Sequence, residues 1–101
     1  MGFYIDSTYF QLNNPYSSGT AIALTYRVDI TGSDDPGHDD YVQVWGSDGT
    51  KWVDEYISAP ATTAGNWYGT IVNVPPLEPG YFDISVTLPD GTAAGATIIV
   101  Q

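Results

Sequence analysis

The segment YVQVWGSDGTKWVDEY, residues Tyr41–Tyr56, contains two alternating runs on either side of Asp48-Gly49. An Asp-Gly pair between such runs is a strong signal for a two-residue β-hairpin turn, because both residues tolerate positive φ. Counting outward from this turn predicts that Trp45 lies opposite Trp52. A three-residue loop would instead shift the register by one residue and break that pairing.

The predicted hairpin has two chemically different faces. One face is mostly aliphatic, with Lys51 and Glu55 as its charged members. The other face is aromatic and polar and comprises Tyr41, Gln43, Trp45, Trp52, Asp54 and Tyr56. Burying the aromatic face would remove more apolar area from water, but it would also bury Gln43 and Asp54 at about 1–3 kcal/mol each if they are unpaired. We therefore favour the aliphatic face inward and keep the opposite orientation as the alternative.

Period-two alternation and turn residues continue along the rest of the chain, and helical periodicity is absent. Prolines fall at the ends of the alternating runs, as hydrogen bonding within a sheet requires. Besides the hairpin, the pattern predicts strands over residues 3–12, 20–31, 66–74, 81–88 and 92–100. About seven strands in 101 residues predict an all-β protein, a single antiparallel β-sandwich domain spanning residues 1–101.

The segment LEPGYFDISV, residues Leu77–Val86, resembles a strand corner of immunoglobulin-like and fibronectin type III-like modules, which often read Leu-x-Pro-Gly-x-Tyr-x-Val-x-Val. The resemblance implies an immunoglobulin-like β-sandwich. Those modules place an inward tyrosine at this corner, and its hydroxyl caps a backbone group. Here the inward position is Phe82, which has no hydroxyl, and Tyr81 lies on the outward parity. We therefore expect ring packing to hold the corner. Because such folds host many functions, the resemblance implies the fold alone.

Twelve acidic residues against two basic ones, Arg27 and Lys51, give a net charge of −10. Nucleic acids and anionic membrane surfaces are bound through lysine and arginine, so neither is an expected partner. No apolar run approaches the roughly 18 residues of a membrane span, so membrane insertion is not expected. The first residues lack the pattern of a cleaved signal peptide. We expect an extracellular or virion-surface location. Three routes are compatible with it: the protein acts where it is made, as virion proteins do, it leaves by a route without a cleaved signal, or the chain is an excised module with an added start.

The sequence offers little for catalysis. It has no cysteine, and its single histidine, His38, lies in an acidic loop. No serine lies in a Gly-x-Ser-x-Gly motif, which positions the nucleophile in many hydrolases. We expect His38 to be solvated and the protein not to be an enzyme, with a small hydrolase as the remote alternative.

Aspartates concentrate around the same loop, and their oxygens suit calcium, which takes about 6–8 oxygen ligands. The regular spacing of an EF-hand is absent. A solvated acidic loop is therefore the favoured interpretation, and a calcium site is the alternative. The candidate ligands are Asp29, Asp34, Asp35, Asp39 and Asp40. No other cofactor is expected.

The aromatic hairpin face is the strongest candidate for a binding surface, because rings fixed on a sheet offer large contact area at low entropy cost. We expect a non-catalytic interaction or structural module that binds a protein or glycan surface through this face, or that assembles as a homo-oligomer. The alternative is a carbohydrate-binding module that stacks sugars on the same rings. Trp67 shares its parity with Ile71, so we expect Trp67 in the core or at its rim.

Overall fold

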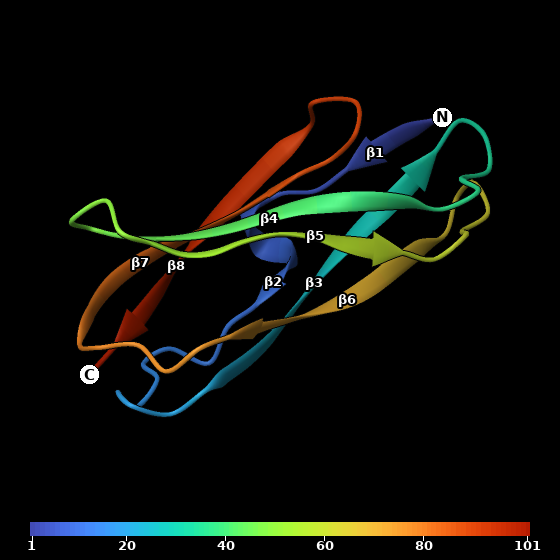
Figure 1. Cartoon of the computed structure of the whole chain (residues 1–101). Helices are drawn as coiled ribbons and strands as arrows, with labels where there is room; N and C mark the ends of the chain where they lie inside the picture. Colours follow the sequence, from blue (N-terminus) through green and yellow to red (C-terminus); the bar gives the residue numbers. More distant parts are fainter.

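Two antiparallel four-stranded sheets pack face to face in the computed structural model, which describes residues 1–101 (Figure 1). Sheet A contains β1 (Gly2–Tyr4), β2 (Phe10–Gln11), β3 (Ile22–Thr31) and β6 (Trp67–Val74). Sheet B has the order β5-β4-β7-β8, with β4 at His38–Gly46, β5 at Lys51–Ala59, β7 at Gly80–Thr87 and β8 at Ala93–Val100. The all-β antiparallel sandwich predicted from the alternation is confirmed.

The molecule is elongated, with extents of 42 × 22 × 18 Å, and its two termini lie at opposite ends (Figure 1). Its helical content is one 3₁₀ turn, η1 (Ser7–Tyr9). No helix has the length and apolar character needed to cross a membrane.

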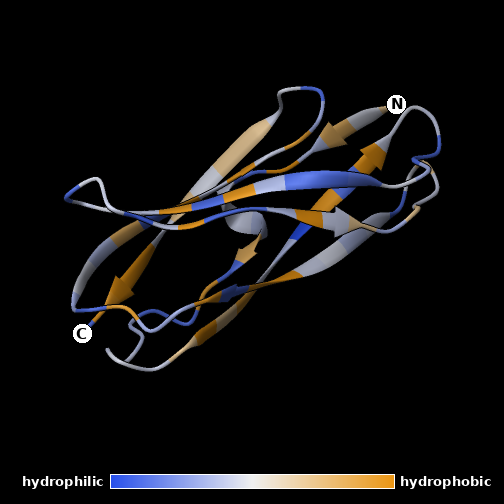
Figure 2. Cartoon of the chain, in the orientation of Figure 1, coloured by the Kyte–Doolittle hydropathy of each residue, from blue (hydrophilic) through white to orange (hydrophobic).

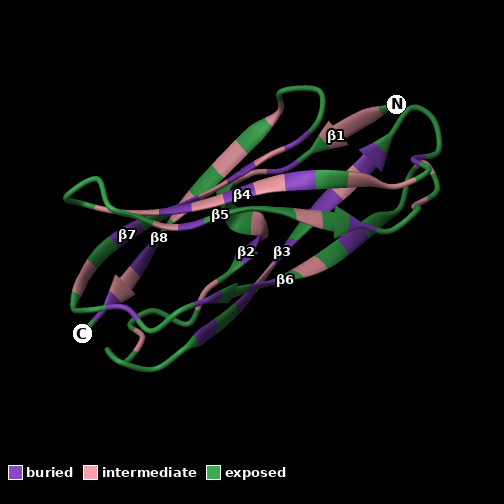
Figure 3. Ribbon diagram, in the orientation of Figure 1, coloured by how far each residue is buried: buried purple, intermediate pink, exposed green.

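The core lies between the sheets and is built from alternate residues of each strand. In β3, Leu24, Tyr26 and Val28 are buried, whereas Ala23 and Arg27 are exposed. Figure 3 shows the resulting bands of buried and exposed residues, and Figure 2 shows the matching alternation of hydropathy. Burial of the apolar set is the main stabilising contribution, at about 25 cal/mol per Å² of apolar area removed from water.

The first predicted strand is interrupted. Residues 3–12 were expected to form one strand, but β1 and β2 are separate and pair successively along the same edge of β3. Between them the carboxylate of Asp6 accepts a hydrogen bond from the backbone N–H of Thr8 at 2.8 Å and caps η1. Asp, Ser and Thr compete with strand pairing in this way because their short side chains bond to nearby backbone groups. The interruption carries Tyr9 onto the outer side of sheet A.

The turn of the β4–β5 hairpin has three residues, so the two-residue turn predicted at Asp48-Gly49 is wrong. The N–H of Gly49 donates to the carbonyl of Gly46 at 3.0 Å, and the N–H of Gly46 donates to the carbonyl of Thr50 at 2.8 Å. Gly49 has φ 87°, and no residue other than glycine has positive φ. This is a type I turn followed by a left-handed glycine, which spares Asp48 the strained conformation that a two-residue turn demands.

A second irregularity restores most of the predicted register. Trp45 pairs with Lys51 and Val44 pairs with Val53, so Trp52 is the extra residue of a β-bulge. Beyond the bulge, Tyr41 lies opposite Tyr56 as predicted. The predicted pairing of Trp45 with Trp52 is therefore wrong, because the bulge absorbs the shift that the longer turn introduces.

The aliphatic face of the hairpin points inward, as predicted: Val42, Val44 and Val53 are buried. The corner after β6 also follows its predicted parity, with Phe82 buried and Tyr81 exposed. The ring of Trp52 turns toward the core and packs edge-on against Phe82, with centroids 6.1 Å apart. Ring packing thus takes the place that a tyrosine hydroxyl would have at this corner.

Candidate functional site

The outer face of the β4–β5 hairpin carries a stacked pair of tyrosines. The rings of Tyr41 and Tyr56 lie 4.8 Å apart at 24°, and Tyr56 is 70% exposed. The hydroxyl of Tyr41 donates to the carboxylate of Asp54 and accepts a hydrogen bond from the amide of Gln43 at 3.1 Å. These contacts fix one tyrosine of the pair, while the other presents its ring to solvent.

The carboxylate of Asp54 is hydrogen-bonded to two neighbouring side chains, Tyr41 and Lys51. Hydrogen bonds from Tyr41 and then Lys51 hold the pKa of Asp54 below its usual value. The same contact with Asp54 raises the pKa of Tyr41. Lys51 Nζ lies 3.1 Å from the Asp54 carboxylate and 4.7 Å from the centroid of Trp45, so it covers that ring.

The structure brings together five of the six residues predicted for the hairpin binding surface. We call this set the hairpin face: Tyr41, Gln43, Trp45, Asp54 and Tyr56. Trp52 is separated from it because the bulge turns its side chain toward Phe82.

The predicted calcium ligands are dispersed. Asp34 accepts a hydrogen bond from the backbone N–H of Ala64, and Asp29 accepts one from the hydroxyl of Tyr9 on sheet A. No cluster of three or more histidine, cysteine or acidic side chains is placed to hold a metal ion. Asp35 and Asp40 lie on either side of His38, but the full candidate set does not form one site: Asp29, Asp34, Asp35, Asp39 and Asp40.

The side chain of His38 is almost fully buried, so the expectation that it is solvated is wrong. Its side chain is 7% exposed. Its Nδ1 lies 2.6 Å from a carboxylate oxygen of Asp35, and its Nε2 lies 2.7 Å from one of Asp40. The ring of Phe3 covers it edge-on at 4.8 Å. The acidic loop folds inward at this point because the backbone of Asp35 pairs with that of Thr62.

Two tyrosines from the opposite sheet complete this interior network. The hydroxyls of Tyr26 and Tyr68 donate to Asp40 at 2.6 and 2.9 Å. Burial, reinforced by Asp40, raises the pKa of both tyrosines, so both remain donors. Every buried polar side-chain atom of the protein has a partner. We call this network the polar clamp: Tyr26, Asp35, His38, Asp40 and Tyr68. It links the two sheets, and its polar groups are hydrogen-bonded to one another.

The sequence contained a signal for this clamp. Asp40 shares the parity of Val42 and Val44 on β4, and Tyr26 and Tyr68 share the parity of their buried neighbours. An inward carboxylate and two inward hydroxyls on facing sheets are expected to meet, because buried polar groups need partners. The position of Asp35 depends on a long-range contact and has no such local signal.

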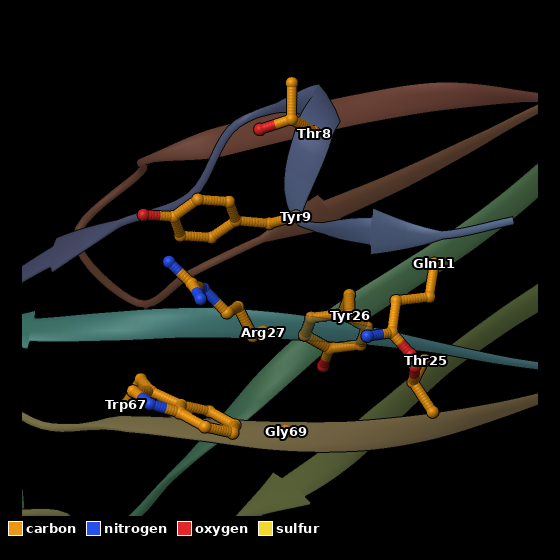
Figure 4. A pocket seen from close by; sticks show the side chains of 8 residues that line it. All are labelled: Thr8, Tyr9, Gln11, Thr25, Tyr26, Arg27, Trp67 and Gly69. Carbon is orange, nitrogen blue, oxygen red and sulfur yellow. Dashed lines mark hydrogen bonds between the residues drawn. The ribbon is translucent and has the colours of Figure 1, made fainter.

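A second aromatic cluster lies on the outer face of sheet A (Figure 4). Arg27 of β3 lies between Tyr9 of η1 and Trp67 of β6, with its guanidinium carbon 4.1 and 5.8 Å from the two ring centroids. Trp67 is 59% exposed, so its predicted place in the core or at its rim is wrong. The opposite parity of β6, which includes Tyr68 and Val72, fills the core instead.

These side chains line a shallow groove of about 680 Å³, which we call the Arg27 groove. Gln11 and Thr25 add polar groups at one end, and Gly69 leaves part of the β6 side without a side chain (Figure 4). The outward parity of Trp67 was predicted wrongly, but that of Arg27 was readable from the sequence. The contribution of Tyr9 was not, because it depends on the interrupted first strand.

The fold and these surfaces define a small acidic β-sandwich domain. No family model matches the chain, and no curated protein sequence matches it. Among solved structures it is similar to the CARDB domain of the PF1109 protein from Pyrococcus furiosus, determined in complex with di-metal ions. The TM-score is 0.62 at 14% identity, over 99% of this chain and 88% of that one. At this identity the likeness shows the β-sandwich fold alone.

Proposed function

We propose that the protein is a non-catalytic interaction module that binds the surface of a partner protein through the hairpin face. The observation that carries this proposal is the Tyr41–Tyr56 stack, which stands on the outer side of sheet B while other side chains fill the core. Asp54 fixes Tyr41, and Tyr56 stacks on the fixed ring. The pair therefore loses little entropy on binding, and tyrosines of this kind concentrate at interfaces.

The setting we propose is an extracellular or virion-surface assembly, with the chain as an immunoglobulin-like module. The buried Phe82 and exposed Tyr81 at the Leu77–Val86 corner support that finer assignment of the fold. A net charge of −10 supports a basic or neutral partner surface over an acidic one.

Metal binding forms no part of the proposal. The CARDB domain of PF1109 was determined with di-metal ions, and the residues of this chain do not fit a comparable centre. Asp35 and Asp40 are its two buried carboxylates. Their oxygens are already hydrogen-bonded to His38, Tyr26 and Tyr68.

Glycan binding on the hairpin face is the alternative, and the hydrogen bonding there favours it less. A sugar needs polar groups that can turn to its hydroxyls. Asp54 is engaged by Tyr41 and Lys51, and Gln43 donates to Tyr41. The polar groups of the hairpin face therefore serve to hold the rings, and the rings provide the contact.

The proposal is tested by comparing Tyr56→Ala with Tyr81→Ala. Both tyrosines are exposed on the outer side of sheet B, but Tyr81 lies outside the hairpin face. Labelled wild type and variants are bound to intact particles or cells of the source. Tyr56→Ala should weaken binding at least about tenfold, as loss of an interface anchor does, while Tyr81→Ala binds as wild type. Equal binding of all three proteins would contradict the proposal.

A further inference from the structure

The Arg27 groove is the second aromatic surface of the molecule and lies on the opposite side from the hairpin face. Four elements build it: η1 supplies Tyr9, β2 supplies Gln11, β3 supplies Arg27, and β6 supplies Trp67 (Figure 4). Its volume of about 680 Å³ lies within the roughly 300–1,000 Å³ typical of small-ligand sites.

Contacts within the groove hold its walls in place. The hydroxyl of Tyr9 donates to Asp29 at 2.5 Å, and the guanidinium of Arg27 lies against the Tyr9 ring. Nε of Arg27 is 3.7 Å from Asp29, the one carboxylate with which Arg27 forms an ion pair. The walls are thus preorganised, which lowers the entropy cost of binding, and the end of the guanidinium still has donors to offer.

The charge balance in the groove favours a neutral ligand. Asp29 offsets the charge of Arg27 locally, and the whole chain carries a net charge of −10. An anion would gain little from Arg27 and would be repelled by the rest of the protein. The groups that remain for a ligand are hydrogen-bond donors and an exposed indole face.

The polar residues at the end of the groove suit hydroxyl groups. The hydroxyl of Thr25 donates to the amide oxygen of Gln11 at 2.8 Å, which leaves the amide nitrogen of Gln11 to donate outward. The C–H groups on one side of a pyranose ring carry partial positive charge and complement the negative face of an aromatic ring. Stacking and hydroxyl recognition are therefore available side by side.

We propose that the Arg27 groove binds a neutral oligosaccharide, with one pyranose ring against Trp67 and its hydroxyls hydrogen-bonded to Arg27 and Gln11. The site is independent of the hairpin face, because the two surfaces lie on different sheets. Failure of either proposal therefore leaves the other unaffected.

The test is a titration of the wild-type protein with neutral cello-, xylo- and manno-oligosaccharides at millimolar concentration, read by the three tryptophan indole N–H resonances in NMR. The Trp67 resonance should shift and those of Trp45 and Trp52 should not. Trp67→Ala and Arg27→Ala should each weaken binding at least about tenfold. Tyr81→Ala, at an exposed tyrosine outside the groove, serves as the matched control and should bind as wild type.

A second variant blocks the groove without removing any of its binding groups. The backbone of Gly69 does not require positive φ, and a Cβ built there meets nothing closer than 3.7 Å. Gly69→Val should therefore fold normally, fill the groove and abolish the Trp67 shift.

Several outcomes would overturn the proposal. These are no shift with any neutral oligosaccharide, a shift only with acidic oligosaccharides, and a shift at Trp45 instead of Trp67. Movement of the Trp67 resonance on concentrating the protein alone, with no response to sugar, would assign the groove to a second copy of the chain.

Discussion

The side chain of His38 lies between two buried carboxylates, one from the loop before β4 and one from β4 itself. Asp35 and Asp40 each keep a hydrogen-bond partner in the interior through this imidazole. Asp40 is also bonded to two tyrosines of sheet A, so the clamp links one sheet to the other. Removing one member leaves buried charge with too few partners, which is among the most destabilising single changes in a protein.

We therefore expect His38→Ala to lower the free energy of unfolding by at least about 3 kcal/mol. Urea unfolding followed by tryptophan fluorescence measures this change. Asp39→Asn is the matched control, because Asp39 lies between these residues in the chain and is exposed, and it should stay within about 0.5 kcal/mol of wild type. If His38→Ala has the same urea midpoint of unfolding as wild type, the clamp does not stabilise the fold.

At the scale of elements, alternation located the strands and their inward faces. The sides of β3, β4 and β7 that face the core follow from parity, because one buried face imposes a period of two. Two departures lie where a side chain bonds to nearby backbone: Asp6 to Thr8 before β2, and Asp48 to Thr50 in the hairpin turn. A third is the exposed position of Trp67 on β6, where the opposite parity fills the core. Two- and three-residue turns share the Asp-Gly signal, so the sequence could not choose between them. The position of Trp52 as the extra residue of the bulge depends on the turn length, so it was not predicted either.

The hairpin turn makes a prediction at this scale. Gly49→Ala should destabilise the protein by about 1–2 kcal/mol, because a Cβ is strained at φ 87°. Gly49→Asn should lose less, since asparagine tolerates this conformation better. Thermal unfolding of the three proteins measures the order.

The control for the turn is Gly69→Ala, in the strand β6, where φ is not positive. It should be neutral or stabilising by up to about 1 kcal/mol. Equal effects of alanine at positions 49 and 69 would show that the left-handed glycine is not what holds the turn.

Over the whole molecule, two sheets present two unlike aromatic surfaces on opposite sides of one core. On the hairpin face the polar groups are hydrogen-bonded to the tyrosine side chain that they hold in place. In the Arg27 groove, hydrogen-bond donors remain available beside the indole. Together the two proposals predict that the chain binds a protein partner on one sheet and a glycan on the other. The first surface was predictable from the sequence and the second was not, because Tyr9 reaches the groove only through the interruption between β1 and β2.

The net charge of −10 acts on the molecule as a whole. Twelve acids, offset by two bases, repel one another across the surface of a domain of 101 residues, and folding brings them closer than they are in the unfolded chain. Raising NaCl from about 0.01 M to about 0.15 M shortens the Debye length from roughly 30 Å to roughly 8 Å. The melting temperature should therefore rise by several degrees over this range.

A variant with Asp39→Asn, Glu78→Gln and Asp83→Asn alters three exposed acids and changes the net charge from −10 to −7. It should melt higher than wild type at low salt and respond less to added salt. A melting temperature that falls with salt would mean that attractive ion pairs such as Lys51–Asp54 outweigh the repulsion. Attraction on that scale is not expected, because the chain has only two basic residues to form such pairs.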